Sequence, residues 1–502
     1  RDVLGSRGLG DVYKRQKTVN IQNIKYMKRA DSIVSEFATP DLLVKREFKI
    51  NKTDAVILYN PDLTDSALLS ELLRALEHFC DGKITAEGLV KSVIYIAETK
   101  TSVDQEGAKQ LILSGDGIIF VEGLKEFIVV NLRKWDKRSI SEPPTSTVMR
   151  GPREGFIEDL KTNLSLIERR VKSPGLAIEK MHIGRIGNTV VALVYLSNVA
   201  DKELVDSVRK KLKSIDVDAV IDSHYLQPVL EERPLSVFHQ TGISEKPDII
   251  VSKMLEGRVA IVVDGSPMVL TVPFMLVEDY QSSEDYYERA SLATFLRIIR
   301  IMSVFFSILL PGLYVALQEF HYSMIPLRFL ITVMTSVNGI PLSPLTEVLF
   351  VILLFEIIRE ASVRMPRAVG MAMSIVGALV LGDTAVKAGI ISSPAVMITA
   401  LSSIALYTAP NQEGTMTLLR VAFTVLGGLG GMYLLLCGIL YLVLYLCSLS
   451  GFGVPYMSPF APLIFADLKD SFYRASLLRM NNRPLSIKNK NKRRRGNGAD
   501  GR

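Results

Sequence analysis

The sequence predicts two α/β units followed by a bundle of membrane-spanning helices. Three observations predict this fold class. The mean hydropathy of +0.26 is high for a soluble protein and low for a chain made only of membrane helices. Charged residues are frequent up to Arg300 and sparse from residue 301 to residue 449. The region before Arg300 is long enough for two compact domains, each with its own hydrophobic core.

The first unit is expected within residues 17–138, where short apolar runs alternate with helical periodicity. The turn sequence Asn60-Pro61-Asp62 separates two of these segments. We leave residues 1–16 out of the fold, because they lack an initiator Met and look like a scar of cloning or sequence assembly. The expected strands are residues 55–59, 117–121 and 127–132, and the expected helices are residues 66–79 and 85–97.

A linker rich in Pro, Ser and Thr and a charged amphipathic helix are expected at residues 139–174. The run Arg150-Gly151-Pro152-Arg153-Glu154 lies between them, with Gly151 and Pro152 forming a turn at the start of the helix. One hypothesis is that this run couples domain movement to the membrane. The alternative is a rigid linker with solvent-exposed charges.

The second unit is expected within residues 175–288 and has the same α/β character. Its clearest helix begins after Asp201 and covers residues 202–215. The expected strands are residues 190–196, 219–221, 249–251, 259–263 and 268–272.

Residues 289–466 are expected to form the membrane domain, because a spanning helix needs about 20 mainly apolar residues. Arg297 and Arg300 precede the first span, so the positive-inside preference places the soluble units in the cytoplasm. Residues 327–340 are short for a span and are expected to be re-entrant. The expected spans are residues 298–317, 345–363, 368–386, 390–409 and 417–449.

The last apolar segment, residues 417–449, is too long for one upright span and contains a cluster of glycines at residues 427–431. We expect a broken pair of spans that returns the basic tail, residues 467–502, to the cytoplasm. The tail accounts for much of the net charge of +7. Such a run near a membrane holds a cytoplasmic end in place or contacts anionic lipid, which we favour over nucleic-acid binding.

Charged residues within residues 345–363 carry the main functional prediction. Glu356 and Glu360 are four residues apart and share one helix face, where they repel each other unless Arg359, Arg364 or water relieves the repulsion. A charge at bilayer depth costs at least about 2.5 kcal/mol, so it faces a bundle interior or water. One interpretation is an acidic path for cations around the axis of several copies. The other is an interfacial helix end whose charges reach the lipid headgroups.

Asp383 and Lys387 also have the four-residue spacing of a helical ion pair, for which we favour a structural role over a conducting one. Cys80, Cys437 and Cys447 have no metal-ligand spacing, and the five histidines form no ligand pattern. The sequence contains no phosphate-binding loop, nucleophile elbow or H-E-x-x-H motif. We therefore expect no metal, no cofactor and no enzymatic activity.

Four stretches, in the order of soluble and membrane parts found here, resemble the A subunit of GerA-type spore germinant receptors of endospore-forming bacteria. Two positions depart from what the resemblance implies: Thr147 stands where Glu is expected, and Glu168 stands where Arg is expected. The four stretches are Asp41-Leu42-Leu43-Val44-Lys45-Arg46, Arg150-Gly151-Pro152-Arg153-Glu154-Gly155-Phe156-Ile157-Glu158-Asp159-Leu160, Phe355-Glu356-Ile357-Ile358-Arg359-Glu360-Ala361 with Arg364-Met365-Pro366-Arg367, and Gly451-Phe452-Gly453-Val454-Pro455-Tyr456-Met457-Ser458-Pro459.

The resemblance implies a nutrient-responsive complex in the inner membrane of the dormant spore. It implies a transporter-like B subunit that binds the germinant and a lipoprotein C subunit as partners. It also implies that the A subunit forms a homo-oligomer that acts as a ligand-gated cation channel. Two alternatives remain: a non-conducting signalling and assembly scaffold, and a secondary transporter, although no inverted repeat of broken helices is visible.

Overall fold

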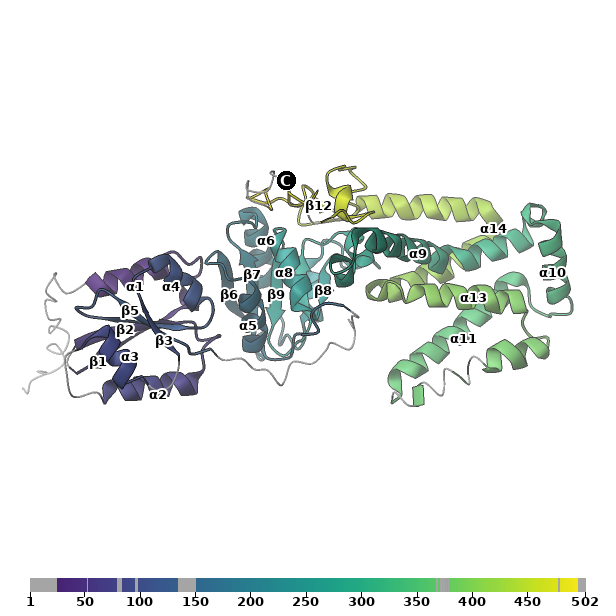
Figure 1. Ribbon diagram of the computed structural model, residues 1–502. Coiled ribbons are helices and arrows are strands. Elements are labelled where there is room, and N and C mark those ends of the chain that lie inside the picture. Colours follow the sequence, from purple (N-terminus) through teal and green to yellow (C-terminus); the bar gives the residue numbers. More distant parts are fainter. Residues whose placement is uncertain are drawn as a thin grey trace, which may run out of the picture.

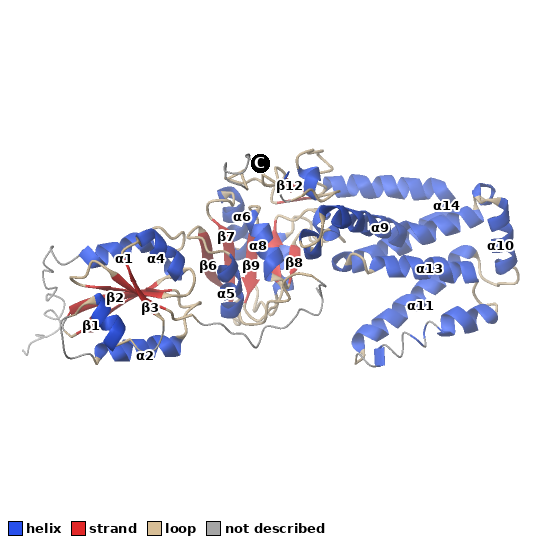
Figure 2. Ribbon diagram, in the orientation of Figure 1, coloured by secondary structure: helices blue, strands red, loops and turns tan. Residues whose placement is uncertain are grey.

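The computed structural model places two α/β units and a helical region in one row (Figure 1). Strands form the centres of the first two parts, and helices make up most of the third (Figure 2). The predicted fold class, two α/β units followed by a helical region, is therefore confirmed. The structure describes residues 25–51, 53–78, 84–94, 98–133, 150–366, 369–370, 375, 377, 379–476 and 479–494.

The first unit is a five-stranded antiparallel sheet with the strand order β1-β2-β4-β5-β3. Helices α1 and α4 cover one face, where Ile33 and Ile112 are buried against the strands. Helices α2 and α3 cover the other face with Leu72 and Leu89. The elements are α1 (Lys25–Ser35), β1 (Val44–Ile50), β2 (Thr53–Tyr59), α2 (Ser66–Glu77), α3 (Ala86–Ser92), β3 (Thr99–Ser102), α4 (Gln105–Ile112), β4 (Gly117–Val121) and β5 (Phe127–Val130).

The second unit is also a five-stranded antiparallel sheet, with the order β6-β7-β9-β10-β8. Helices α5 and α8 bury Leu164 and Met254 on one face, and α6 buries Val208 on the other. The elements are α5 (Leu160–Arg170), β6 (Leu176–Ile183), β7 (Thr189–Leu196), α6 (Lys202–Lys213), α7 (Gln227–Leu230), β8 (Gly242–Ser244), α8 (Pro247–Leu255), β9 (Val259–Val263) and β10 (Val269–Val272).

The two units have the same topology, which the sequence analysis did not predict. In each, the first two strands form a hairpin, the third strand lies at the far edge, and the fourth and fifth strands complete the sheet. Left-handed glycines recur at matching turns: Gly115 and Gly257 precede the fourth strand, and Gly123 and Gly265 follow it. Only glycine adopts this backbone conformation readily, so the shared turns identify a structural repeat.

Two predicted strands of the second unit are wrong. Residues 219–221 lie in a loop, and residues 249–251 lie inside α8. Both runs are short and apolar, and periodicity cannot separate a short strand from a buried segment of helix. The other expected strands and the helices beginning at Ser66, Ala86, Leu160 and Lys202 are present with modest shifts of their ends.

The two units contact each other through the segments before β1 and after β2 of the first unit and through α5 and β6 of the second. Asn60 Nδ2 donates a hydrogen bond of 3.1 Å to Glu168, which is 3% exposed. The Lys180 ammonium lies 3.4 Å from the Asp62 carboxylate. The Ile178 amide donates to the Thr39 hydroxyl. Glu168, the residue that departs from the expected Arg, therefore lies at the contact between the units.

The helical region begins with α9 (Ala290–Glu319), which packs against α13 and α14. α9 and residues Pro410–Ser448 are the two described helices that are long and apolar enough to cross a bilayer. The predicted span at residues 368–386 lies only partly within the described residues, where Val380–Ala385 form a short π-helix. The other helices are α10 (Leu327–Val337), α11 (Pro344–Arg364), α13 (Ser393–Leu406) and α14 (Glu413–Ser448).

Helix α14 is broken where the sequence predicted an interruption. Gly430 and Gly431 leave the helical conformation, and Gly431 has a φ of 58°. The second arm folds back on the first, because Gly438 faces Phe423 and Leu426 (Figure 1). Each arm is roughly 27 Å long at the rise of an α-helix. The chain therefore leaves α14 on the side of the α/β units.

After α14 the chain forms the short ladder of β11 (Ser450–Gly451) and β12 (Val454–Pro455). The following C-terminal segment, residues 456–494, lies along the second unit (Figure 1). Its basic residues Lys490 and Arg494 contact the second unit, at Ser197 and Glu256 respectively. The described part of the basic tail is therefore docked on protein.

Candidate functional site

The predicted acidic residue Glu356 lies in a cluster of charges between α11 and α14. One Glu356 oxygen is 2.6 Å from the Arg359 guanidinium, and the other pairs with Arg420 of α14. Arg359 also pairs with Glu413 at 2.8 Å. Arg420 is fully buried and donates to Ser403 of α13. We call these four charged residues, Glu356, Arg359, Glu413 and Arg420, the charge cluster.

The charge cluster is formally neutral, with two carboxylates and two guanidinium groups. Removing an ion from water costs several kcal/mol, and only well-formed pairs offset that cost. The surrounding helices are apolar, so the cluster fixes how α11 packs against α14. Arg420 was missed by the sequence analysis. The sequence does contain an indication of its importance, because Arg420 is the single charged residue between Glu413 and Leu449.

Glu360 has a different environment from Glu356, although both belong to α11. Its carboxylate pairs with Arg364 at 2.6 Å, and both side chains are largely exposed. The structure does not bring Glu360 into the charge cluster. A shared path for cations through both residues stays a prediction.

The predicted pair of Asp383 and Lys387 is confirmed, with a distance of 2.6 Å between the charged groups. Both side chains are more than half exposed. Two other acidic residues bind helix N-termini: Glu319 accepts from the Leu345 amide of α11, and Glu347 accepts from the Ser392 amide before α13. Acidic groups are favourable at such positions because free amides point outward there.

The Arg150–Glu154 run links the second unit to the segment before α9. Arg150 pairs with Glu288 at 2.9 Å. Gly151 has a φ of 122° and lies against the Tyr287 ring, where a side chain would clash. Glu154 pairs with Arg169 and Arg170 of α5. Burial tends to raise the pKa of Glu154, but the hydrogen bonds from both arginines hold it below its ordinary value.

A junction of buried charges ties α9 to the rest of the protein. Arg297 is fully buried and binds Asp285 at 2.8 Å and Asp470 at 3.1 Å, while Arg300 binds Asp285 at 2.8 Å. Burial tends to raise the pKa of Asp285, but Arg300 and Arg297 hold it below its ordinary value. Burial raises the pKa of Asp470 to about 6 despite Arg297. The two arginines are thus paired within the protein.

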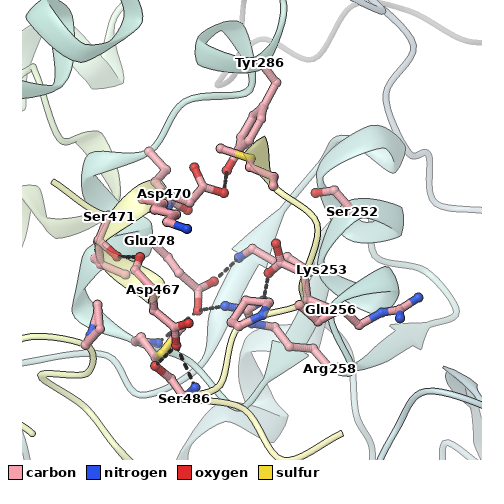
Figure 3. A pocket seen from close by; sticks show the side chains of 18 of the residues that line it. Ser252, Lys253, Glu256, Arg258, Glu278, Tyr286, Asp467, Asp470, Ser471 and Ser486 are labelled. Atoms are coloured by element: carbon pink, nitrogen blue, oxygen red, sulfur yellow. Dashed lines mark hydrogen bonds and ion pairs between the residues drawn. The ribbon is translucent and has the colours of Figure 1, made fainter. Parts of the chain in front are cut away.

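A cavity of about 360 Å³ lies beside this junction, between α8, the segment before α9 and the C-terminal segment (Figure 3). Glu278 accepts from Arg258 at 2.9 Å and pairs with Lys253 at 2.7 Å on one side of it. Asp467 and Asp470 of the C-terminal segment also line the cavity (Figure 3). Among the described residues, no group of three or more His, Cys, Asp or Glu side chains could hold a metal ion.

Comparison with known proteins places this architecture in a family. A family model described as "Bacillus/Clostridium GerA spore germination protein" matches residues 31–486. The chain belongs to the GerA spore germination protein family. The match covers both α/β units, the helical region and most of the C-terminal segment of this GerA-family chain.

Named relatives of the GerA-family chain match it over most of their length. Spore germination protein KA of Bacillus subtilis (strain 168) is 36% identical over 467 residues, covering 91% of this chain and 86% of the relative. Spore germination protein GerLA of Bacillus cereus is 32% identical, with 91% and 94% covered. The uncharacterized membrane protein YfkQ of Bacillus subtilis is 35% identical, with 85% and 82% covered.

One solved structure is also similar in sequence to part of this GerA-family chain. It is the crystal structure of the N-terminal domain of the A subunit of the Bacillus megaterium spore germinant receptor GerK3. The two sequences are 26% identical, and the TM-score is 0.38. The comparison covers 49% of this chain and 92% of the solved chain.

Proposed function

We propose that this GerA-family chain is a subunit of a nutrient-germinant receptor in the spore inner membrane. Several copies assemble into a ligand-gated cation channel whose opening triggers germination. Family membership and the names of the relatives support the role in germination. The observation that carries the channel proposal is the charge cluster, because ionisable groups among apolar helices mark ion pathways.

In this proposal the charge cluster holds the closed state. Arg420 and Arg359 neutralise Glu356, so the carboxylate is not available to a cation. A shift of α14 relative to α11 separates Arg420 from Glu356 and leaves an acidic group for a cation to approach. Glu360 lies on the outside of the single chain and contributes to the path between copies.

The proposed complex has a transporter-like B subunit that binds the germinant and a lipoprotein C subunit. Large apolar side chains on the helical region, such as Phe305 and Leu440, are more than half exposed and suit contact with lipid. The α/β units then lie in the cytoplasm, together with the C-terminal segment that contacts them.

Ion flux through liposomes that contain the chain and its partner subunits tests the proposal. Addition of germinant should release K⁺ or Na⁺, and Glu356→Gln should reduce that flux strongly. Asp383→Asn is the matched control, because Asp383 is an exposed acidic residue of the same region and should leave flux unchanged. Unchanged flux in the double variant Glu356→Gln, Glu360→Gln would exclude both residues from the path.

A non-conducting signalling and assembly scaffold is the second candidate function. It is favoured by the contacts that hold both ends of the helical region to the α/β part, at Arg297 and at Asn489. In that case, helix movements would pass a partner's signal to the soluble units. Absence of any conductance with all three subunits present would support the scaffold.

A further inference from the structure

The first unit is closed by the chain that directly follows its last strand. Thr64, just before α2, forms an antiparallel bridge with Arg133, three residues after β5. The Asp65 amide donates to the Leu132 carbonyl at 2.8 Å. A Cβ at the left-handed Gly115 would lie 3.2 Å from the Arg133 side chain. The segment 132–133 therefore lies against both the turn before α2 and the turn before β4.

The second unit cannot be closed in this way, because its chain leaves in another direction after β10. Met275 is three residues after β10, as Arg133 is after β5. Its amide donates to Glu278, and the next amide, Leu276, donates to the Tyr456 carbonyl. Buried Arg258 holds Glu278 at 2.9 Å. This segment leads to α9 instead of returning to the turn before α6.

The C-terminal segment takes the equivalent position in the second unit. Ala200 precedes α6 as Thr64 precedes α2, and it forms an antiparallel bridge with Asn489. The Lys490 amide donates to the Val199 carbonyl at 2.9 Å. A Cβ at left-handed Gly257, the counterpart of Gly115, would lie 3.2 Å from Asn489. The bridge and the glycine contact thus match those of the first unit.

Further contacts hold this segment in place. Ile487 is 2% exposed and packs against Met275 and Val277. The Lys490 ammonium donates to the Ser197 carbonyl at 3.0 Å, and Arg483 donates to the Leu255 carbonyl. Apolar burial and main-chain hydrogen bonds together are the means by which an added strand binds a sheet protein.

We propose that residues 487–490 are the closing strand of the second unit, in the role that residues 132–133 have in the first. The helical region is then an insertion within the second unit, between β10 and its closing strand. The two ends of the helical region are held by one domain. Release of the closing strand frees the end of the C-terminal segment from the second unit, while the end of α14 stays attached through Arg233 and Glu232.

A disulfide between Ala200→Cys and Asn489→Cys tests the proposal in the full chain. The native cysteines are first replaced by serine. In a non-hydrogen-bonded antiparallel pair the two Cβ atoms are close enough for a disulfide. Ala200→Cys with Lys492→Cys is the matched control, because Lys492 is three residues further along the same segment. We expect high-yield oxidation within one chain for the first pair and low yield for the control.

Two outcomes of the disulfide experiment would overturn the proposal. Equal yields for the two cysteine pairs would mean that the segment has no fixed register on the second unit. Disulfides formed only between chains would mean that the closing strand comes from a second copy. Non-reducing electrophoresis and mass spectrometry of the linked peptides distinguish these outcomes.

Hydrogen exchange in a chain that ends at Ser486 gives a second test. Amides at residues 199–201 and 257–259 should exchange at least about tenfold faster than in the full chain. The equivalent amides at residues 63–65 and 115–117 should not change, because the first unit keeps its own closing strand. Added peptide of residues 481–494 should restore protection. Unchanged exchange in the second unit would contradict the proposal.

Discussion

At the scale of single residues, Arg420 links three apolar helices to one another. Its guanidinium is fully buried and joins Glu356 of α11 to Ser403 of α13. A lone cation in apolar surroundings is unfavourable, so the helices are stable only in an arrangement that supplies Glu356. The charge of Arg420 is costly to bury, and for that reason it favours the one packing of α11, α13 and α14 in which it is paired.

Replacement of Arg420 by methionine should destabilise the helical region by about 1.5–3 kcal/mol, because Glu356 loses one of its two arginine partners and keeps only Arg359. Thermal unfolding in detergent measures the change. Arg364→Met is the control, since the exposed pair of Arg364 and Glu360 is worth less than about 1 kcal/mol. If both variants lose the same stability, the charge cluster does not organise the helices.

Glu168 is the second residue with an individual effect. It is 3% exposed, and burial raises its pKa to about 8; Asp62 also raises it, while Asn60, Lys180 and Lys161 lower it. The folded protein therefore keeps this proton at pH values where the unfolded chain, with an ordinary pKa of 4.5, loses it. Stability from this group is complete below pH 4.5 and falls as the pH rises to about 8.

Glu168→Gln should remove this pH dependence, because glutamine stays neutral and keeps a carbonyl oxygen for Asn60. The free energy of unfolding of the variant should exceed that of the parent at pH 8 and approach it at pH 5. Denaturant unfolding between pH 5 and pH 9 measures the difference. Parallel pH profiles for the two proteins would show that Glu168 is already ionised in the folded state.

At the scale of elements, α9 and α14 cross at two glycines. A Cβ at Gly312 would meet the Phe423 carbonyl, and a Cβ at Gly427 would meet the Gly312 carbonyl, both closer than real Cβ atoms come. Small residues allow this close approach of helix backbones in membranes. The glycine cluster of α14 thus has two roles: Gly427 serves the crossing, while Gly430 and Gly431 break the helix.

Gly312→Ala or Gly427→Ala should separate α9 from α14 and lower the thermal unfolding midpoint. The added methyl group overpacks the crossing, which lowers the free energy of unfolding by about 1–3 kcal/mol. Gly414→Ala is the control, since no atom lies within 4 Å of its added Cβ. That substitution should be neutral or stabilising because alanine favours helix. Equal tolerance at all three positions would mean that the crossing is loose.

The elements also show what the sequence could predict. Long periodic segments such as α6 and fully apolar strands such as β9 were found because their patterns are local. The structural repeat was not predicted, because the two units share their strand order and their turn glycines but no obvious repeat in the amino-acid sequence. Of the two partners of Glu356, the sequence indicated Arg359 but not Arg420, because Arg420 lies 64 residues away and only packing brings the two together.

At the scale of the whole molecule, one buried carboxylate joins the soluble and helical parts. Asp285 binds both Arg297 and Arg300 at the start of α9, and Arg297 also binds Asp470 of the C-terminal segment. The stretch from Asp285 to Arg300 and the C-terminal segment, which are distant in sequence, thus meet at one junction. If α9 moves relative to the second unit, these ion pairs either break or move together with α9.

Asp285→Asn should loosen the junction by about 3–5 kcal/mol, because it leaves two arginines without their common partner. The pair stabilises the protein above the unfolded pKa of Asp285, and its contribution is lost as the pH falls through the lower folded pKa. Faster proteolysis at residues 275–289 at pH 7 is the measurement. Asp383→Asn, an exposed pair, should leave cleavage unchanged.

The closing strand of the second unit also sets an order for synthesis. Domains generally fold as units, beginning at the amino terminus, while the ribosome is still working. The first unit has all its parts once residue 133 has emerged, whereas the second unit needs residues 487–490. The ribosome therefore makes every helix of the bundle before the second unit can be finished. A chain that stops early leaves this unit open and exposed to quality-control proteases.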